Sequence, residues 1–267
     1  MKRLQLPSSG VYLLMVLSLV VFAADLWCQD PGADRARITA EIKAGLSSLT
    51  STKSSYDGKF LEVLYTTPEA FEEDCEIVGN VDRKHIEFRP PRIPGKTVGE
   101  EIQRGFAGNT SGLMFLRPHF TGEVTVEVEV LYQWIERGSH LMVLLHGSDE
   151  GYWGSDFGVR AVLNRKGKKL RIERSKFPEF NKDPTKWFDR TAWHKQKLVF
   201  KPSEEKLTTF LDGMNTSEMT MKKAPTAGQV GFLWNKVKFS VCSVKIRGEL
   251  DRQWAARELK IDTGSGK

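Results

Sequence analysis

The sequence predicts an all-β fold, a two-sheet antiparallel β-sandwich with a short N-terminal helix. Residues 123–130 alternate strictly between polar residues and valine, which is the period-two pattern of a strand with one buried face. Further short apolar or alternating runs follow, and Gly, Pro and Asn turn signals separate them. No helical pattern recurs between these runs, as it would in an α/β protein. These observations favour strands paired through turns over strands joined by crossover helices.

Loops of two kinds connect the predicted strands. Residues 147–158 are rich in glycine and aromatic residues, and residues 177–190 contain prolines and Trp187, so both segments are expected to be loops. Residues 69–74 are acidic and predict one short helical turn. The expected strands cover 59–65, 76–81, 85–89, 111–116, 123–130, 141–145, 159–163, 169–174, 193–200, 206–211, 229–234 and 237–246.

The N-terminus has the pattern of a secretory signal peptide. Lys2 and Arg3 precede an uncharged apolar run at 11–24. A membrane-spanning helix needs about 20 consecutive apolar residues, so this run favours a cleaved signal over the alternative of an uncleaved anchor. We expect residues 1–28 to be removed, which leaves Gln29 first. The protein is then secreted or periplasmic, with no stable membrane insertion after cleavage.

The remaining chain divides into three parts. Residues 29–58 are predicted to be a helical and linker segment, because apolar residues recur there at helical spacing. Residues 59–250 are the predicted sandwich domain. Residues 251–267 form a C-terminal tail, for which we expect a helical turn that folds Trp254 back.

Composition and residue spacing indicate no cofactor and specify no partner. The 267 residues have a formal net charge of +6, a mild excess that specifies no binding partner. A secreted chain without basic residues interleaved with aromatic ones is not expected to bind nucleic acid. The five histidines are scattered, and no Cys/His spacing fits a metal site. We therefore expect neither a cofactor nor a bound metal.

Two cysteines remain after the expected cleavage, Cys75 and Cys242. They lie near the first and last predicted strands, which are neighbours if the two ends of the chain meet in one sheet. Secretion makes a disulfide between them chemically possible. Two separate buried thiols explain the same residues equally well, since cysteine commonly packs as a small apolar side chain. The sequence leaves both alternatives open.

The last two-thirds of the chain contain a recognisable order of motifs. An E-V-E-V strand precedes S-H-L-M-V-L-L-H-G, W-H-K-Q-K-L-V-F pairs with L-T-T-F-L-D-G-M, and G-Q-V-G-F-L-W leads into the last strand. Over residues 105–250 this order resembles the concanavalin A-like lectin and glucanase superfamily, including its laminin-G-like jelly rolls. It is most similar to the 3-keto-disaccharide hydrolase domain family of secreted bacterial proteins. The matching positions are Trp193, Leu211, Asp212, Gly213, Gly228, Gly231, Phe232 and residues 239–250.

The resemblance implies a jelly-roll fold and an interaction with carbohydrate. Its motifs are turns, glycines and core aromatic residues, which identify a fold and transfer no catalytic residue. The chain has Val241, Cys242 and Ser243 where that family usually has an asparagine in its last strand.

Glu127 and Glu129 are the candidate catalytic residues. Alternate residues of a strand point the same way, about 7 Å apart, and two carboxyl groups at such a distance serve glycoside hydrolysis. Laminarinase-type enzymes on this fold also place an aspartate between their glutamates. Here Thr125 and valines occupy the intervening positions, and Thr125 does not carry protons as a carboxyl group does. The alternative interpretation of both residues is a solvated sheet face.

The candidate ligand-binding residues lie in and around the 147–158 segment. Aromatic rings stack on the C–H faces of sugars, while carboxylates and guanidinium groups bind their hydroxyls, and such sites favour loops on rigid scaffolds. The alternative is an aromatic plug that closes the end of the sandwich. A calcium site formed by Asp149, Glu150 and Asp156 is disfavoured, because their spacing fits no defined calcium loop. The candidate residues are Tyr132, Trp134, Tyr152, Trp153, Asp156 and Arg160.

Three functions are therefore considered for the secreted sandwich. The first is glycan binding through the aromatic segment and the polar sheet face, with an oligo- or polysaccharide as the partner. The second is hydrolysis of a glycosidic bond, as in the 3-keto-disaccharide hydrolases. The third is a structural or protein-binding module of the laminin-G type, which predicts a buried Trp153 and a wet glutamate face.

Overall fold

The computed structural model describes residues 31–78, 86–87, 106–108, 111–148, 151–156, 160–165, 168–178, 192–222 and 224–262. The predicted signal peptide, 1–28, lies outside these residues. None of the described helices has the length and apolar composition of a membrane span. The helices are α2 (Pro31–Ala44), α3 (Leu46–Leu49), α4 (Pro68–Asp74), the 3-10 turn η3 (Pro202–Glu204) and α6 (Arg252–Glu258).

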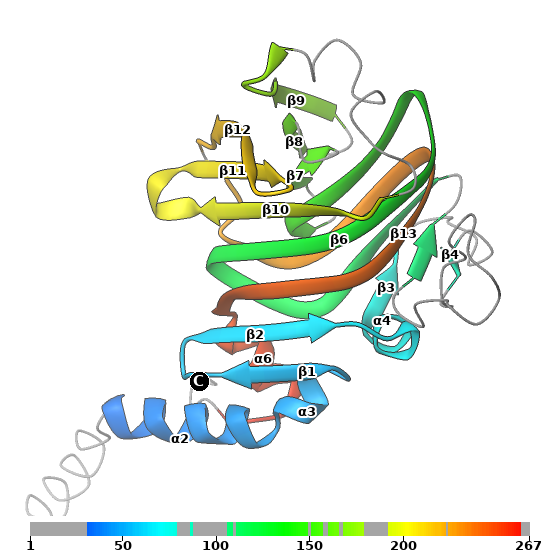
Figure 1. The fold of residues 1–267 in the computed structure, drawn as a ribbon. Coiled ribbons are helices and arrows are strands. Elements are labelled where there is room, and N and C mark those ends of the chain that lie inside the picture. Colours follow the sequence, from blue (N-terminus) through cyan, green and yellow to red (C-terminus); the bar gives the residue numbers. More distant parts are fainter. Residues whose placement is uncertain are drawn as a thin grey trace, which may run out of the picture.

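Antiparallel strands form two layers, and two long strands, β6 and β13, run through both (Figure 1). The first sheet has the order β1-β2-β13-β6-β10-β11-β12. In the second sheet, β13 lies between two segments of β6, with β3 beside one segment and β7, β8 and β9 following the other. The strands are β1 (Lys53–Tyr56), β2 (Phe60–Tyr65), β3 (Cys75–Ile77), β4 (Ile86–Glu87), β5 (Phe106–Gly108), β6 (Ser111–Ser148), β7 (Gly151–Asp156), β8 (Arg160–Arg165), β9 (Lys168–Glu173), β10 (His194–Lys201), β11 (Lys206–Leu211), β12 (Met214–Thr220) and β13 (Ala227–Leu250).

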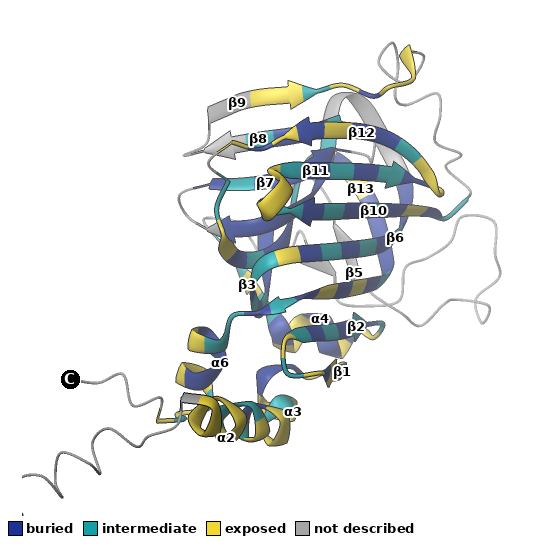
Figure 2. Ribbon diagram, turned by 90° about the vertical axis from the view of Figure 1, so that its left-hand side faces the viewer, coloured by how far each residue is buried: buried dark blue, intermediate teal, exposed yellow. Residues whose placement is uncertain are grey.

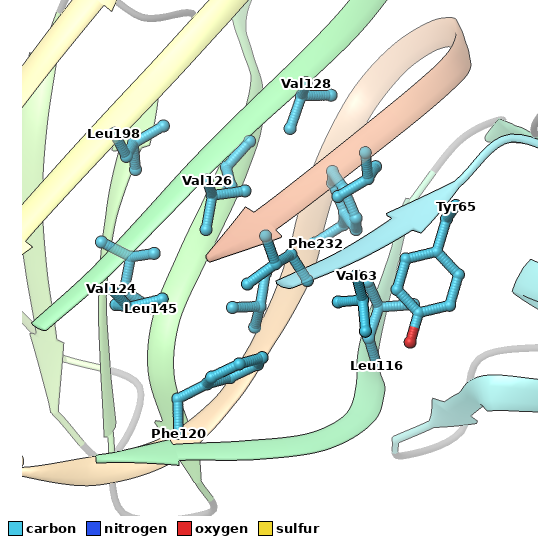
Figure 3. Packing of buried hydrophobic residues seen from close by; sticks show 14 of the residues in the cluster. Val63, Tyr65, Leu116, Phe120, Val124, Val126, Val128, Leu145, Leu198 and Phe232 are labelled. Carbon is cyan, nitrogen blue, oxygen red and sulfur yellow. The ribbon is translucent and has the colours of Figure 1, made fainter. Parts of the chain in front are cut away.

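The predicted two-sheet sandwich with a short N-terminal helix is confirmed. Its core lies between the layers, where inward side chains from both sheets meet (Figure 3). The four valines of the 123–130 run are at most 1% exposed, while the polar residues between them are half-buried or exposed. A similar alternation of buried with half-buried or exposed residues runs along β10 and β11 (Figure 2), whereas in β12 the neighbouring Thr216 and Ser217 are both buried.

The expectation of a loop over 147–158 is wrong for residues 151–156, which form strand β7 between β6 and β8. The glycines that suggested a loop serve close packing instead. A Cβ atom at Gly154 would lie 2.3 Å from the carbonyl oxygen of Val143 in β6, so only glycine fits this pairing. Strands β1 and β12 were not predicted either, because their serine- and threonine-rich sequences lack a clear apolar alternation.

The C-terminal tail folds back as expected. The carboxylate of Asp251 accepts hydrogen bonds from the backbone N–H groups of Gln253 and Trp254 and so caps α6. Trp254 is 4% exposed and belongs to the core. Helix α6 lies beside α2, to which the side chain of Arg252 donates hydrogen bonds.

Cys75 and Cys242 are not joined by a disulfide. Cys75 is half-buried in β3 of the second sheet, whereas Cys242 is buried in β13, beside the part of that strand that pairs in the first sheet. Of the two alternatives that the sequence left open, the structure contains the separate thiols.

Candidate functional site

Glu127 and Glu129 lie on the outer face of the first sheet, opposite the inward valines. Glu127 is in register with Lys197 on one side and Lys245 on the other. Its Oε1 lies 3.0 Å from the ammonium nitrogen of Lys197, and Lys245 in turn lies 3.1 Å from Glu62. Opposite charges therefore alternate across neighbouring strands, an arrangement that stabilises a sheet surface.

Glu129 has a similar environment. Its carboxylate accepts a hydrogen bond from the hydroxyl of Ser243 at 3.2 Å, and Lys195 lies opposite it on β10. A glycosidase needs two carboxyl groups whose surroundings assign them different roles. Both of these carboxylates contact a polar group of an adjacent strand on a solvated face. Their similar surroundings therefore do not distinguish a general acid from a nucleophile or base.

The two aromatic residues of β7 point in opposite directions. The Trp153 side chain is 2% exposed and packs in the core between the sheets. Tyr152 is half-buried and packs on the other face of the second sheet, against a small apolar cluster that includes Phe115 and Leu144. A ring as buried as Trp153 offers no face for a sugar to stack on.

Some of the candidate residues lie outside the described residues. Asp149 and Glu150 are among them, and so is the side chain of Trp134, whose backbone belongs to β6. Within the described chain no group of three or more His, Cys, Asp or Glu residues is arranged to hold a metal ion.

The structure brings Tyr132, Asp156 and Arg160 together with other polar residues at one end of the sandwich. Strand β7 ends there and β8 begins, while on the first sheet β10 begins and β11 ends. Most of these side chains are buried, although Arg160 is 28% exposed and Asp212 is 45% exposed. We call this group the polar end cluster, and it comprises Tyr132, Ser155, Asp156, Arg160, His194, Gln196 and Asp212.

The phenol of Tyr132 is a fully buried member of the polar end cluster. Burial raises the pKa of Tyr132 well above its usual value of 10, and the negative charges of Asp156 and Asp212 raise it further. The phenol is therefore neutral at physiological pH. The ring of His194 lies 6.5 Å from that of Tyr132, measured between centroids.

A histidine–aspartate pair borders the polar end cluster on the solvent side. Nδ1 of His194 lies 2.8 Å from Oδ2 of Asp212. The other carboxylate oxygen of Asp212 accepts a hydrogen bond from the backbone N–H of Lys195 at 2.8 Å. Asp212 adopts a positive φ of 49° in the β11–β12 turn, which directs its side chain back towards β10.

An ion pair on the second sheet and an amide from the first sheet complete the cluster. The guanidinium of Arg160 lies 2.6 Å from Oδ2 of Asp156. The side-chain amide of Gln196 donates a hydrogen bond across the sandwich to the backbone carbonyl of Ser155 at 3.2 Å. Gln196 and Ser155 are both fully buried.

Several buried polar atoms in and beside the cluster have no hydrogen-bond partner in the structure. Such atoms are rare in folded proteins, and each costs about 1–3 kcal/mol unless a ligand or water satisfies it. Trp153 is one pleat repeat, about 7 Å, from Ser155 along β7. The atoms are Trp153 Nε1, Ser155 Oγ, Arg160 Nε and Gln196 Oε1.

Sequence reasoning missed Ser155, His194, Gln196 and Asp212. A signal for Gln196 was present, because it occupies the same alternation as Leu198 and Phe200 and so is a polar residue at an inward position. Asp212 was interpreted only as a turn residue. Its distance from His194 arises from the β10–β11 register, which the sequence alone does not specify.

No family model and no curated protein matches the sequence. Among solved structures, peanut lectin matches with a TM-score of 0.44 at 7% identity, over 70% of this chain and 97% of that chain. Arcelin-5, a lectin-like defense protein from Phaseolus vulgaris, gives a TM-score of 0.41 at 10% identity, over 71% and 99%. A carbohydrate-binding module from Bacillus subtilis gives 0.39 at 8% identity, over 51% and 83%.

These similar structures are lectins and a carbohydrate-binding module, as expected from the resemblance to concanavalin A-like proteins. At TM-scores of 0.39–0.44 the likeness carries no argument about what this chain binds. The similarity to the 3-keto-disaccharide hydrolases stays a prediction.

Proposed function

We propose that this chain is a secreted carbohydrate-binding protein in which sugar hydroxyls bind at the polar end cluster. The observation that carries the proposal is the set of buried polar atoms without partners at Trp153, Ser155, Arg160 and Gln196. Each buried group of this kind requires an explanation, and a bound ligand, an ion or an ordered water supplies one. Ser155 lies next to the last residue of β7, Arg160 is the first residue of β8, and Gln196 is the third residue of β10.

The chemistry of these atoms fits a polyhydroxylated ligand. A hydroxyl group both donates and accepts hydrogen bonds. The Trp153 and Arg160 nitrogens are donors, the Gln196 amide oxygen is an acceptor, and the Ser155 hydroxyl is both. A ligand that offers both donors and acceptors suits this mixed set, which a purely anionic or purely cationic group does not.

In this proposal Trp153 has a different role from the one the sequence suggested. Its ring packs in the core and its indole N–H acts as a donor. The ligand reaches the cluster past Arg160 and Asp212, the members with substantial solvent exposure. The sequence-predicted catalytic residues, Glu127 and Glu129, lie on the outer face of the first sheet and take no part.

A structural or protein-binding module is the second candidate function. The burial of Trp153 and the cross-strand ion pair between Glu127 and Lys197 favour it, because both features are expected of a sandwich with a wet outer face. In this case ordered water molecules satisfy the atoms of the polar end cluster. The hydrolase hypothesis would instead require Glu127 and Glu129 to act as a pair on that outer face.

The test is a screen of neutral oligosaccharides for binding and turnover, with wild-type protein and the Ser155→Ala variant. The Ser155 hydroxyl makes no hydrogen bond in the structure, so its removal leaves stability unchanged or slightly higher. If a sugar hydroxyl binds there, the same substitution weakens binding about fivefold, since one hydrogen bond is worth roughly 1 kcal/mol. Unchanged sugar affinity in Ser155→Ala would contradict the proposal and indicate that water molecules satisfy these polar atoms.

Two further variants control this experiment. Ser217 is also fully buried, but its hydroxyl already hydrogen-bonds to the carbonyl oxygens of Glu173 and Arg174. Ser217→Ala is therefore expected to lower stability and leave sugar affinity unchanged. If the protein turns over an oligosaccharide, and if this activity is lost in Glu127→Gln but kept in Ser155→Ala, the binding proposal is wrong and the hydrolase hypothesis is favoured.

A further inference from the structure

We propose that the outer face of the second sheet holds a separate binding pocket for one neutral, hydroxyl-rich ring of monosaccharide size. A hollow of about 310 Å³ lies there, among residues of β3, β6 and β13. This volume is at the small end of the range for small-molecule sites. None of the lining residues is one of the candidate site residues predicted from the sequence or a member of the polar end cluster, and the proposal does not depend on that cluster.

A β-bulge forms the floor of the pocket. Gln229 of β13 pairs with Gly147 and Gly231 pairs with Leu144, so β6 has one residue more than β13 between these pairs. His146 takes up the extra residue with a left-handed φ of 46°. Bulges and left-handed residues cost energy and concentrate at functional sites.

Two glycines allow the close packing that forms the floor of the pocket. A Cβ atom at Gly228 would lie 2.6 Å from the backbone carbon of His146 and 2.8 Å from the carbonyl oxygen of Gly147. At Gly147 a Cβ atom would lie 2.1 Å from the ring of Phe115. The two glycines thus let the backbones and the Phe115 ring approach closely, which leaves a shallow surface of backbone edges and one aromatic wall.

Three polar side chains border this surface. The imidazole of His119 lies opposite Gln229 across the β6–β13 pairing, and the carboxylate of Glu76 in β3 also lines the pocket. The His119 ring is held in place by stacking on Trp254 of α6, with centroids 5.4 Å apart and planes 10° apart. The amide nitrogen of Gln229 donates to the carbonyl of Leu116 at 3.3 Å, which fixes its orientation.

The charge of the lining selects the class of ligand. Among the described lining residues Glu76 is the charged member, and none of them is a lysine or arginine. Arg117, between the lining residues Phe115 and His119 in sequence, instead donates hydrogen bonds to the carbonyls of Ser48 and Leu49. A carboxylate disfavours an anionic ligand, while the combination of carboxylate, imidazole and amide provides hydrogen bonds for neighbouring hydroxyls.

The test is a titration of ¹⁵N-labelled protein with methyl glucoside, methyl galactoside and methyl mannoside, followed through the backbone amide signals of Gly147 and Gly228. At least one neutral glycoside is expected to shift both signals saturably. Glucuronate, the anionic control, is expected to bind more weakly. The Glu76→Ala variant is expected to bind about tenfold more weakly, because a hydrogen bond to a charged group is lost.

Matched variants distinguish this pocket from the proposed glycan site. Glu72 lies in α4 and is exposed like Glu76, but it does not line the pocket, so Glu72→Ala is expected to bind normally. In Ser155→Ala the Gly147 and Gly228 signals are expected to shift as in the wild type, whatever happens at the polar end cluster, and this result separates failure of the pocket from failure of that cluster. The proposal would be overturned if none of the three glycosides shifted the Gly147 and Gly228 signals. Tighter binding of glucuronate than of the neutral glycosides, or equal effects of Glu72→Ala and Glu76→Ala on binding, would also overturn it.

Discussion

The side-chain amide of Gln196 in β10 donates a hydrogen bond to the backbone carbonyl oxygen of Ser155 in β7, with 3.2 Å between nitrogen and oxygen. Both residues are fully buried, and the bond joins the two sheets at the end where the polar side chains gather. The register of β10 determines this contact, because it places Gln196 on the inward face opposite Val128.

The first prediction is that a negative charge at position 196 destabilises the protein. Gln196→Glu replaces a buried donor by a carboxylate near Asp156 and Asp212, and an uncompensated buried charge costs about 3–5 kcal/mol. The free energy of unfolding at pH 7 should fall by about that amount, and part should return at pH 5 because burial favours the protonated form. Urea unfolding at the two pH values measures both effects.

Gln253→Glu is the matched control for that prediction. Gln253 is exposed in α6, so the same substitution there is expected to change stability by less than about 0.5 kcal/mol. Equal effects of the two substitutions at pH 7 would show that the Gln196 side chain is not buried between the sheets.

The second prediction concerns a buried carboxylate near the first strands. Asp74 is 2% exposed and accepts hydrogen bonds from Thr50, from Ser51 and from the phenol of Tyr65, the last at 3.0 Å. Tyr65→Phe should lower the free energy of unfolding by about 2 kcal/mol, because a bond to a charged acceptor is lost. Tyr56→Phe, which removes a bond to the neutral carbonyl of Gly58, should cost about 1 kcal/mol. A larger loss of stability in Tyr56→Phe than in Tyr65→Phe would contradict the hydrogen-bond network around Asp74.

The third prediction is a pH dependence that arises from His146. Burial lowers the pKa of this imidazole to about 4, and its Nδ1 lies 3.1 Å from the carbonyl of Pro225. Below pH 6.5 the unfolded chain takes up a proton that the folded chain does not. Stability contributed by His146 is therefore lost as the pH falls from 6.5 to about 4, in total about 3 kcal/mol.

His146→Asn removes this titration and suits the left-handed backbone, since asparagine tolerates positive φ. The stability difference between wild type and variant should change with pH between 4 and 6.5 and stay constant above that window. A difference that is independent of pH throughout would mean that the imidazole is accessible to protons in the folded protein.

The fourth prediction tests whether residues 151–156 pair as a strand. Gly154→Ala forces a Cβ atom against the backbone oxygen of Val143, so overpacking should cost about 3 kcal/mol. Gly213→Ala is the comparison, because nothing lies within 4 Å of a Cβ atom there and only the positive φ of 83° is strained, which costs about 1 kcal/mol. Thermal unfolding of both variants decides the matter. A smaller loss of stability in Gly154→Ala than in Gly213→Ala would contradict the strand pairing of residues 151–156 and favour a loop there.

The fold was largely predictable because its signal is periodic. The valines of 123–130 identified one buried face, and the expected strands at 59–65, 193–200 and 206–211 agree closely with β2, β10 and β11. The failure at β7 has a physical cause. Glycines and aromatic residues favour loops locally, whereas here Gly154 permits close strand pairing and Trp153 fills the core.

The candidate site was only partly predictable, because strand pairing and register decide which polar residues meet. Tyr132, Asp156 and Arg160 were identified by type and do come together, but Glu127 and Glu129 lie on another face. An inward polar residue within an alternating strand, such as Gln196, is the signal that points to the cluster.

The most direct measurement follows the indole N–H signal of Trp153 while the best oligosaccharide of the screen is added. The signal is assigned by its loss in Trp153→Phe, and the indole of Trp234, 1% exposed elsewhere in the core, is the internal control. Sugar binding at the polar end cluster predicts a saturable shift of the Trp153 indole proton and an unmoved Trp234 signal. Full sugar binding with an unmoved Trp153 indole would contradict the account.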